Sequence, residues 1–348
     1  MTSLPHREPS NDTSPATVLR HLSTGFWISQ AIAVVADLGI ADHLKNGAKS
    51  CAELAQAVGA HPGALYRLLR GTASVGVFAE DETGRFALTP LAALLLTDRH
   101  QSWRAAAILN GAVWAWQPWG ALAYSVKTGQ PAFDHVFGVD FDGYLAQHGE
   151  AGEVFQAFMD VATAEEAMAV TPVYDFSGLT TIVDVGGGHG ALLAAILKAN
   201  PGPRGILFDA PHVVASAPPR LEAEGVADRC EVVGGDFFAA LPPGGDAYLL
   251  KWILVSWDDE RAVTILQNCR RALSAHGKLL VIERIIPPGN EPFFGKLADL
   301  NLLVMYQGRH RTEAEYRSLF ARAGFELSRI IPTESPTEFS VIEGLPTA

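Results

Sequence analysis

A glycine-rich loop between a short strand and a helix constrains this chain more than any other feature. The run Thr181–Val185 reads as a buried strand, Gly186–Gly190 follows with glycine at all but one position, and Ala191–Ala199 has the spacing of a helix. Glycines let a backbone turn sharply and approach a ligand closely, and the N-terminus of a helix presents free N–H groups. The arrangement therefore predicts an α/β domain that binds a nucleoside.

Strands and helices alternate regularly after this loop. We expect further strands at 205–208, 230–233, 246–250 and 278–283, with helices at about 259–273 and 312–323. Such alternation predicts a mostly parallel, Rossmann-like sheet with helices on both faces. The closing strands, 325–331 and 338–342, are joined by too short a loop for a parallel crossover. We therefore expect them to pair antiparallel.

The N-terminal part of the chain has a helical rhythm. Apolar residues at helical spacing predict one helix over 26–44, and Ser50 precedes Glu53 as in a capping box at the start of the next. A helix at 61–75 and a small hairpin formed by 76–79 and 85–88 complete a winged-helix pattern. We expect a disordered leader over residues 1–17, a helical domain over 18–170 and an α/β domain over 171–348.

Charge and composition separate two interpretations of the winged helix. The chain has 26 Lys and Arg against 38 Asp and Glu, and the expected recognition helix carries only Arg67 and Arg70 as basic residues. A DNA-binding regulator is therefore disfavoured, and we predict that the chain binds no nucleic acid. A dimerisation module is favoured, because the aromatic residues between 105 and 170 exceed what a small core needs. They predict a homodimer or an apolar pocket.

Cysteine usage and hydropathy indicate a compartment. The three cysteines, Cys51, Cys230 and Cys269, are far apart and include no CxxC pair, as in a reducing environment. No apolar run approaches 18 residues, so we predict no membrane span and a cytoplasmic protein.

Three acidic positions near the glycine loop suggest which nucleoside is bound. Asp209 ends the second strand, where a carboxylate can accept hydrogen bonds from a ribose diol. Asp184 precedes the glycines and can attract a positive ligand group, and Asp236 with Phe237 offers adenine one acceptor and one aromatic wall. Gly186, Gly188 and Ala191 also satisfy a loose dinucleotide pattern, which leaves NAD as the alternative. S-adenosylmethionine, a sulfonium nucleoside, fits these residues better.

Several runs together resemble one family. They are Asp184–Gly190, Phe208–Val213, Gly235–Phe238, Lys251–Leu254 and Trp257–Glu260. In this order and spacing they are similar to the caffeate-type S-adenosylmethionine-dependent O-methyltransferases, especially those of bacterial natural-product pathways. The resemblance covers nearly the whole chain, since this family also has an N-terminal winged-helix domain that dimerises.

The resemblance implies roles for individual residues. Gly186 would lie under the methionine part of S-adenosylmethionine, Asp209 would hold its ribose, Asp236 and Phe237 its adenine, and Lys251 would flank it. Met159 resembles the family methionine that packs on the acceptor ring, although a core methionine is an equally good interpretation.

The chain departs from the family pattern where the catalytic base should be. Val255 occupies the position of the family histidine that deprotonates phenols, and valine accepts no proton. His310 replaces a family glutamate that faces the acceptor, and Glu283 matches a second one. We predict that His310 acts as the base and that Glu283 orients or polarises it. In the alternative interpretation, His310 only bonds backbone at a helix start.

These observations leave two enzymatic hypotheses. The first is methyl transfer to a small aromatic or polyketide-like acceptor, expected on oxygen, with N- or C-methylation open. The second is an enzyme of the same fold that keeps the cofactor but has lost methyl transfer and acts as a hydroxylase, decarboxylase or pericyclase. No group of His, Asp and Glu has the spacing of metal ligands, so we predict no metal.

Overall fold

The computed structural model describes residues 14–99, 102–333 and 338–347. Within these residues the chain forms two compact units, and the division falls between Trp116 and Gln117. The helices between 122 and 170 belong to the same unit as the large sheet. A functional boundary near residue 170 stays a prediction.

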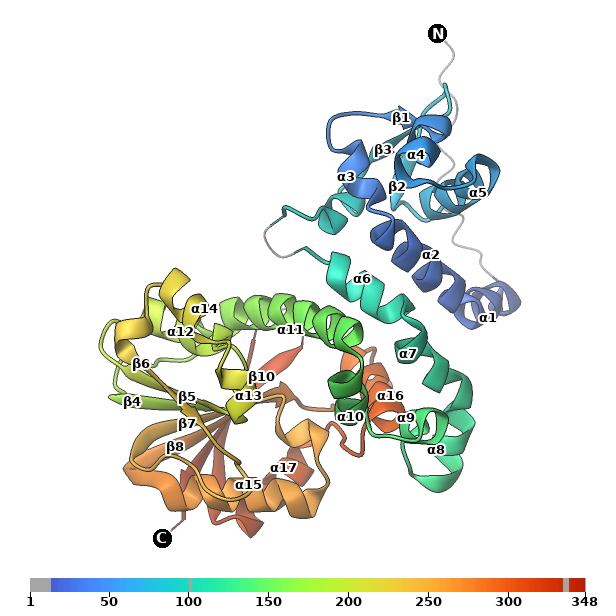
Figure 1. The fold of residues 1–348 in the computed structure, drawn as a ribbon. Coiled ribbons are helices and arrows are strands. Elements are labelled where there is room, and N and C mark those ends of the chain that lie inside the picture. Colours follow the sequence, from blue (N-terminus) through green and yellow to red (C-terminus); the bar gives the residue numbers. More distant parts are fainter. Residues whose placement is uncertain (1–13, 100–101, 334–337, 348) are drawn as a thin grey trace. The chain divides into compact units, whose positions relative to one another are not determined.

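The first unit contains a winged helix. Its described elements are α1 (Pro15–Ser23), α2 (Gly25–Asp37), α3 (Ile40–Leu44), β1 (Lys49–Ser50), α4 (Cys51–Val58), α5 (Pro62–Ala73), β2 (Phe78–Glu80), β3 (Arg85–Leu88), η1 (Ala92–Leu95), α6 (Arg104–Gly111) and α7 (Val113–Trp116) (Figure 1). The strands pair antiparallel in the order β1-β3-β2. The capping box that the sequence predicts is present, because the Ser50 hydroxyl accepts from the Glu53 N–H and Glu53 accepts from the Ser50 N–H.

Two expectations for this unit need correction. The helix expected over 26–44 is broken, because Gly39 adopts a φ of +63° between α2 and α3. Glycine enters this left-handed region without a Cβ penalty and so commonly ends helices. Most of the expected disordered leader, residues 1–13, lies outside the described residues. Its end is helical, because the Ser14 hydroxyl caps α1 at Pro15.

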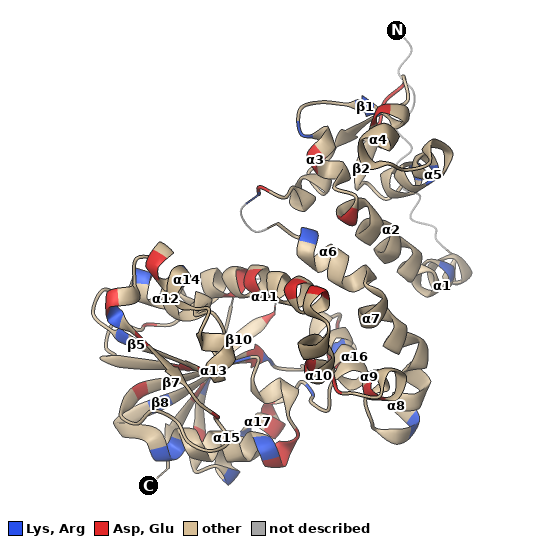
Figure 2. Ribbon diagram, viewed as in Figure 1, with Lys and Arg blue, Asp and Glu red and all other residues tan. Residues whose placement is uncertain are grey.

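Helices α1 and α2 present apolar side chains to solvent. Leu19, Leu22, Phe26 and Trp27 are each more than half exposed. Figure 2 shows how few charged residues interrupt α2, whose sequence contains Asp37 alone. An exposed apolar face of this kind is typical of a subunit interface.

The second unit begins with helices and continues as an α/β sandwich. The helical elements are η2 (Gln117–Ala121), α8 (Leu122–Thr128), α9 (Ala132–Phe137), α10 (Phe141–Gln147), α11 (Gly149–Val170), α12 (Ala191–Ala199), α13 (Pro211–Val214), α14 (Pro218–Ala223), η3 (Ala227–Arg229), η4 (Leu254–Ser256), α15 (Asp259–Ala272), α16 (Phe294–Met305) and α17 (Glu313–Arg322). None of the helices in the described part of the chain has both the length and the apolar character that a bilayer crossing requires.

The described strands of this unit form one sheet of seven. They are β4 (Thr181–Val185), β5 (Arg204–Asp209), β6 (Cys230–Gly234), β7 (Gly245–Lys251), β8 (Leu273–Arg284), β9 (Phe325–Pro332) and β10 (Phe339–Pro346). Their order is β6-β5-β4-β7-β8-β10-β9, with the first five parallel. Strand β10 runs antiparallel to both β8 and β9, which confirms the α/β class and the antiparallel final pair.

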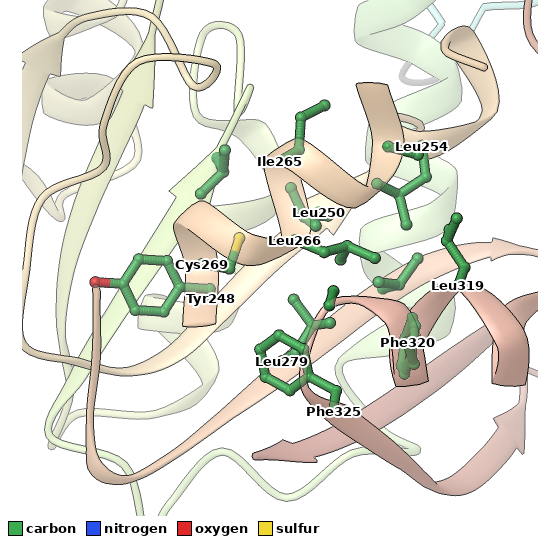
Figure 3. Packing of buried hydrophobic residues seen from close by; sticks show 14 of the residues in the cluster. Tyr248, Leu250, Leu254, Ile265, Leu266, Cys269, Leu279, Leu319, Phe320 and Phe325 are labelled. Atoms are coloured by element: carbon green, nitrogen blue, oxygen red, sulfur yellow. The ribbon is translucent and has the colours of Figure 1, made fainter. Parts of the chain in front are cut away.

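Apolar side chains fill both faces of this sheet. Figure 3 shows one of the two clusters, in which Leu266 and Cys269 of α15 and Phe320 of α17 pack on Leu250 and Leu279 of the sheet. The other cluster lies under α12 on the opposite face. Burial on both faces explains why the parallel strands read as continuous apolar runs. The rigid sheet then fixes the loops at its carboxyl edge.

A charged cluster ties the final strands together, and it predicts a pH-dependent stability. Glu343 accepts from the Tyr174 hydroxyl at 2.5 Å and the Arg329 Nε at 2.9 Å, while Lys278 lies 3.7 Å away. Burial alone would raise the pKa of Glu343, but these hydrogen bonds and charges lower it to about 2. The folded state therefore favours the ionised carboxylate.

We expect Glu343→Gln to lose about 1–2 kcal/mol of unfolding free energy at neutral pH. This is less than the lowered pKa of Glu343 implies, because the Arg329 side chain is 55% exposed and water screens its charge. Because the pKa is lowered in the folded state, the ionised Glu343 contributes its full stabilisation at pH values above the ordinary glutamate pKa of about 4.3. The difference from wild type should therefore shrink as the pH falls from about 4.5 toward 2. Urea unfolding across this range measures it, and the exposed Glu326→Gln is the control. A difference independent of pH would contradict the assignment.

Candidate functional site

The glycine loop turns back on the neighbouring strand. Gly186 has a φ of +68°, and its N–H donates to the carbonyl oxygen of Phe208 at 2.7 Å. A Cβ at Gly186 would lie 2.3 Å from Cδ1 of Ile253, so a larger residue there would have to displace the end of the Ile253 side chain and hold a strained φ. At Gly188, where φ is +59°, a Cβ would meet no atom within 4 Å. The loop is thus closely packed at its start and open at Gly188.

Asp209 holds the open part of the loop. Its Oδ2 accepts the Gly188 N–H at 2.8 Å, and its Oδ1 accepts the Ala210 N–H at 2.6 Å. Each carboxylate oxygen has two acceptor sites, so both retain capacity for a further donor. The residue that the sequence assigns to the ribose thus lies against the glycine loop.

Asp236 and Phe237 follow β6 at the same edge. Asp236 is exposed, and its Oδ1 accepts the Phe238 N–H at 2.8 Å, which fixes the turn. The ring of Phe237 packs edge-on against Trp257 at 6.2 Å, and its Cε1 lies 3.9 Å from the Cβ position of Gly186. The Phe237 ring therefore lies beside the glycine loop with Asp236 next to it in the chain, and the adenine role of the two residues stays a prediction.

Asp184 lies buried below the loop. Its side chain is 1% exposed, and its Oδ2 has no hydrogen-bond partner. Burial raises the pKa of Asp184 to about 7, against the opposing charge of Lys251. A buried carboxylate oxygen without a partner is rare and often marks a functional site.

Lys251 ends β7 and reaches across to α11. Its Nζ lies 2.9 Å from Oγ1 of Thr163 and 3.0 Å from Oε2 of Glu166. The Glu166 side chain is 1% exposed and that of Lys251 10%. The sequence singles out Lys251 but neither partner, because no local pattern relates positions this far apart in the chain.

Val255 lies in the short turn η4 after β7. It is 4% exposed, and its N–H donates to Oε1 of Glu283 at 3.1 Å. The Tyr316 hydroxyl donates to the other oxygen of Glu283. Burial raises the pKa of Glu283 to about 7, although the bond from Tyr316 and the charge of Arg311 oppose this rise. Glu283 is therefore bound to the turn and to α17, and within the described part of the chain its side-chain hydrogen bonds go to Val255 and Tyr316 rather than to His310.

A second clamp holds the same turn. The buried guanidinium of Arg311 donates to the carbonyl oxygens of Leu254 and Trp257 at 2.8 and 2.9 Å and to Asp259 at 3.0 Å. A Cβ at Gly308 would come 1.7 Å from the Val255 carbonyl oxygen, so only glycine permits this approach. The backbone at the family base position is thus firmly fixed.

His310 is buried beside α16, in the segment that pairs with the chain just after β8. It is 8% exposed, and its backbone N–H donates to Oδ1 of Asp299 at 2.7 Å. The ring nitrogen Nδ1 is buried without a hydrogen-bond partner. Burial, followed by the charges of Arg284 and Arg311, lowers the pKa of His310 to about 4. The imidazole is therefore neutral at pH 7 and has an unengaged ring nitrogen.

Helix α11 carries an aromatic wall that includes Phe155 and Phe158, beside Met159, which the sequence assigns to the acceptor ring. Met159 is half-buried on it, next to Phe158, whose ring lies 6.4 Å from that of Trp252. One turn earlier, Phe155 packs against Phe141 at 5.1 Å. Trp252, to which the sequence alone assigns no role, has a φ of +59° and a buried Nε1 without a hydrogen-bond partner. A non-glycine residue in this region is strained and often belongs to a functional site.

These residues fit S-adenosylmethionine better than a metal ion. The carboxylate of Asp209 bonds the open glycine turn, Asp184 lies under it, and the buried Oδ2 of Asp184 suits a positively charged ligand. Among the described residues, no group of three or more His, Cys, Asp or Glu side chains could hold a metal ion.

Comparisons with known proteins agree with this arrangement. A family model for the O-methyltransferase domain matches residues 119–326, and one for the O-methyltransferase dimerisation domain matches residues 20–98. The phenazine O-methyltransferase PhzM of Lysobacter antibioticus is 46% identical over 331 residues, which cover 95% of this chain and 96% of that protein. The aclacinomycin 10-hydroxylase RdmB of Streptomyces purpurascens is 38% identical over 323 residues, which cover 90% and 86%.

Solved structures give the same result. The crystal structure of LaPhzM superposes with a TM-score of 0.91 at 46% identity and covers 96% of this chain and all of that one. An O-methyltransferase from neocarzinostatin biosynthesis, NcsB1, was solved with S-adenosylmethionine and 2-hydroxy-5-methyl naphthoic acid. It superposes with a TM-score of 0.79 at 34% identity, over 91% and 95% of the two chains.

Proposed function

The chain belongs to the O-methyltransferase family with an N-terminal dimerisation domain, and we propose that it methylates a hydroxyl group of a small, flat aromatic natural product. The observation that carries the proposal is the open glycine turn held by Asp209 beside the aromatic wall of α11. When bound, S-adenosylmethionine supplies a methyl group on a positively charged sulfur.

The side chains around the loop divide the binding of that cofactor. Gly186 lies under its methionine part, Asp209 accepts hydrogen bonds from its ribose, and Asp236 and Phe237 receive its adenine. The low charge of the α1–α2 face supports a homodimer formed by the N-terminal unit. Three free cysteines support the cytoplasm as the place where the enzyme works.

The acceptor side offers only a weak base. Val255 cannot accept a proton, Glu283 is engaged with the η4 turn, and His310 has a pKa of about 4. We therefore propose that the aromatic wall and Met159 position a hydroxyl that is acidic enough to ionise near neutral pH, and that His310 accepts its hydrogen bond or proton through Nδ1. Alignment of nucleophile and methyl group can then supply most of the acceleration.

The test is a turnover assay with hydroxylated aromatic acceptors that differ in pKa, with S-adenosylhomocysteine measured by mass spectrometry. We expect acceptors with a hydroxyl pKa of about 6–7 to react fastest at pH 7. His310→Ala should slow the methylation of the less acidic acceptors by about 10- to 100-fold and that of the most acidic ones much less. General-base catalysis matters only when a proton must be removed during the reaction. The exposed His276→Ala on β8 is the control.

Two results would contradict this assignment of His310. One is an equal loss for all acceptors in the His310 variant, which indicates a structural role, and the other is no loss for any. Binding of S-adenosylmethionine without methyl transfer to any acceptor would favour the second hypothesis. Under that hypothesis the fold serves hydroxylation, decarboxylation or a pericyclic step. The observation that favours it is the similarity to a relative named as a 10-hydroxylase. Transfer to nitrogen or carbon would be detected in the same assay by the mass and fragmentation of the product.

A further inference from the structure

We propose that Thr163 and Glu166 are positioning residues that hold the Lys251 ammonium ready for the carboxylate at the amino acid end of S-adenosylmethionine. The inference deepens the proposed function and rests on it, because it assumes that this cofactor occupies the glycine loop. The contacts come from two elements: Lys251 ends β7, while Thr163 and Glu166 lie one turn apart on α11.

Sheet register places this cluster beside the loop. Val185 of β4 pairs with Leu250 of β7, so the next residues, Gly186 and Lys251, leave the sheet at the same edge. Helix α11 also reaches the loop one turn earlier, where the Asp160 carboxylate lies 3.9 Å from Nδ1 of His189. The ammonium of Lys251 therefore stands where a ligand on Gly186 would place its charged end.

Stability alone does not account for a buried ion pair of this kind. Removing both charges from water costs about as much as their attraction returns, so such pairs contribute little net stability. Glu166 is 1% exposed, and burial raises its pKa against the opposing charge of Lys251. Burying the Lys251–Glu166 pair therefore brings little net stability, which indicates that the pair serves binding rather than folding.

The donors of Lys251 indicate what the cluster binds. An ammonium has three donors, of which Thr163 and Glu166 take two. The Trp252 ring, whose centroid lies 4.9 Å from Nζ, accepts no conventional hydrogen bond, so one donor is left for a further acceptor. A carboxylate suits it, because charge-assisted bonds of this type are short and strong. The buried, unpartnered Oδ2 of Asp184 is an independent sign that a charged ligand lies here, since it suits the positive groups that accompany that carboxylate.

The experiment compares two ligands that differ only at this end. S-adenosylhomocysteine carries the amino acid group, and 5′-methylthioadenosine lacks it but keeps adenosine and sulfur. Calorimetric titration of the full-length wild-type protein should show much tighter binding of S-adenosylhomocysteine. Glu166→Gln should weaken the binding of S-adenosylhomocysteine by about 10- to 100-fold, the range for a lost charged hydrogen bond. The affinity for 5′-methylthioadenosine should change by less than about 2-fold.

Three further variants separate positioning from packing. Glu165→Gln, the neighbouring residue on α11, should leave both affinities unchanged. Glu166→Asp, which keeps the charge on a shorter side chain, should restore part of the selectivity. Thr163→Val keeps the volume and loses one partner of Lys251, so it should weaken S-adenosylhomocysteine by about 3- to 10-fold with little effect on 5′-methylthioadenosine.

The outcomes are distinguishable. Glu166→Gln with unchanged selectivity between the two ligands overturns the inference, and if that variant does not fold, the same result for Thr163→Val overturns it. Equal losses for both ligands also overturn it, because they indicate a general distortion of the site. If wild type binds neither ligand, the proposed function itself fails.

Discussion

Arg311→Met is expected to destabilise the second unit by about 2–4 kcal/mol, a larger loss of stability than we expect for Glu343→Gln. Methionine fills most of the volume but removes one donor from each of the carbonyl oxygens of Leu254 and Trp257, and it removes one of the two guanidinium partners of Asp259. The two carbonyl oxygens lose a charged donor that methionine cannot replace, and a buried acceptor that loses its donor is destabilising because it has already left water. Thermal unfolding followed by circular dichroism should show a midpoint lower by about 10 °C.

Arg309→Met is the matched control for this prediction. Arg309 also bonds Asp259 and further bonds Glu315, but its side chain is 48% exposed, so its loss should cost less than about 1 kcal/mol. Similar losses for the two variants would contradict the idea that Arg311 clamps the η4 turn. Methyl transfer should also fall in Arg311→Met, because the clamped segment carries Val255 and leads to the Trp257 ring beside Phe237.

The α/β core could be predicted closely from sequence because its signals are local. The strand expected at 181–185 and the helix expected at 191–199 have the observed bounds, and the glycine loop lies between them. A buried parallel strand is a continuous apolar run, and glycines mark its end, so both can be recognised from neighbouring residues. The break at Gly39 was missed because the apolar spacing continues through it.

The contacts that define the site could not be predicted, because they join residues far apart in the chain. Lys251 and Glu166 are separated by 85 positions, and Arg311 and Leu254 by 57. The pKa of His310 likewise depends on burial and on Arg284 and Arg311, which only the folded chain brings near. Sequence could name a histidine as a base, but only its surroundings show how weak a base it is.

Asp209→Ala is expected to weaken the binding of S-adenosylhomocysteine by at least about 100-fold, the largest effect on affinity. In our proposal the carboxylate performs two tasks at once. It fixes the loop through the N–H groups of Gly188 and Ala210, and its remaining acceptor sites receive the ribose hydroxyls. Two charged hydrogen bonds of about 1.5–3 kcal/mol each account for a loss of this size.

Ligand chemistry can separate these two tasks. An analogue of S-adenosylhomocysteine without the ribose hydroxyls should bind wild type weakly, and Asp209→Ala should bind it about as weakly as the normal ligand. Asp209→Asn keeps the shape and one acceptor oxygen, so it should fall between wild type and the alanine variant. The exposed Asp228→Ala is the control and should change nothing. If the alanine variant still binds the ligand with ribose hydroxyls more tightly than the one without them, Asp209 does not bond the ribose. Its only role is then to hold the loop at Gly188.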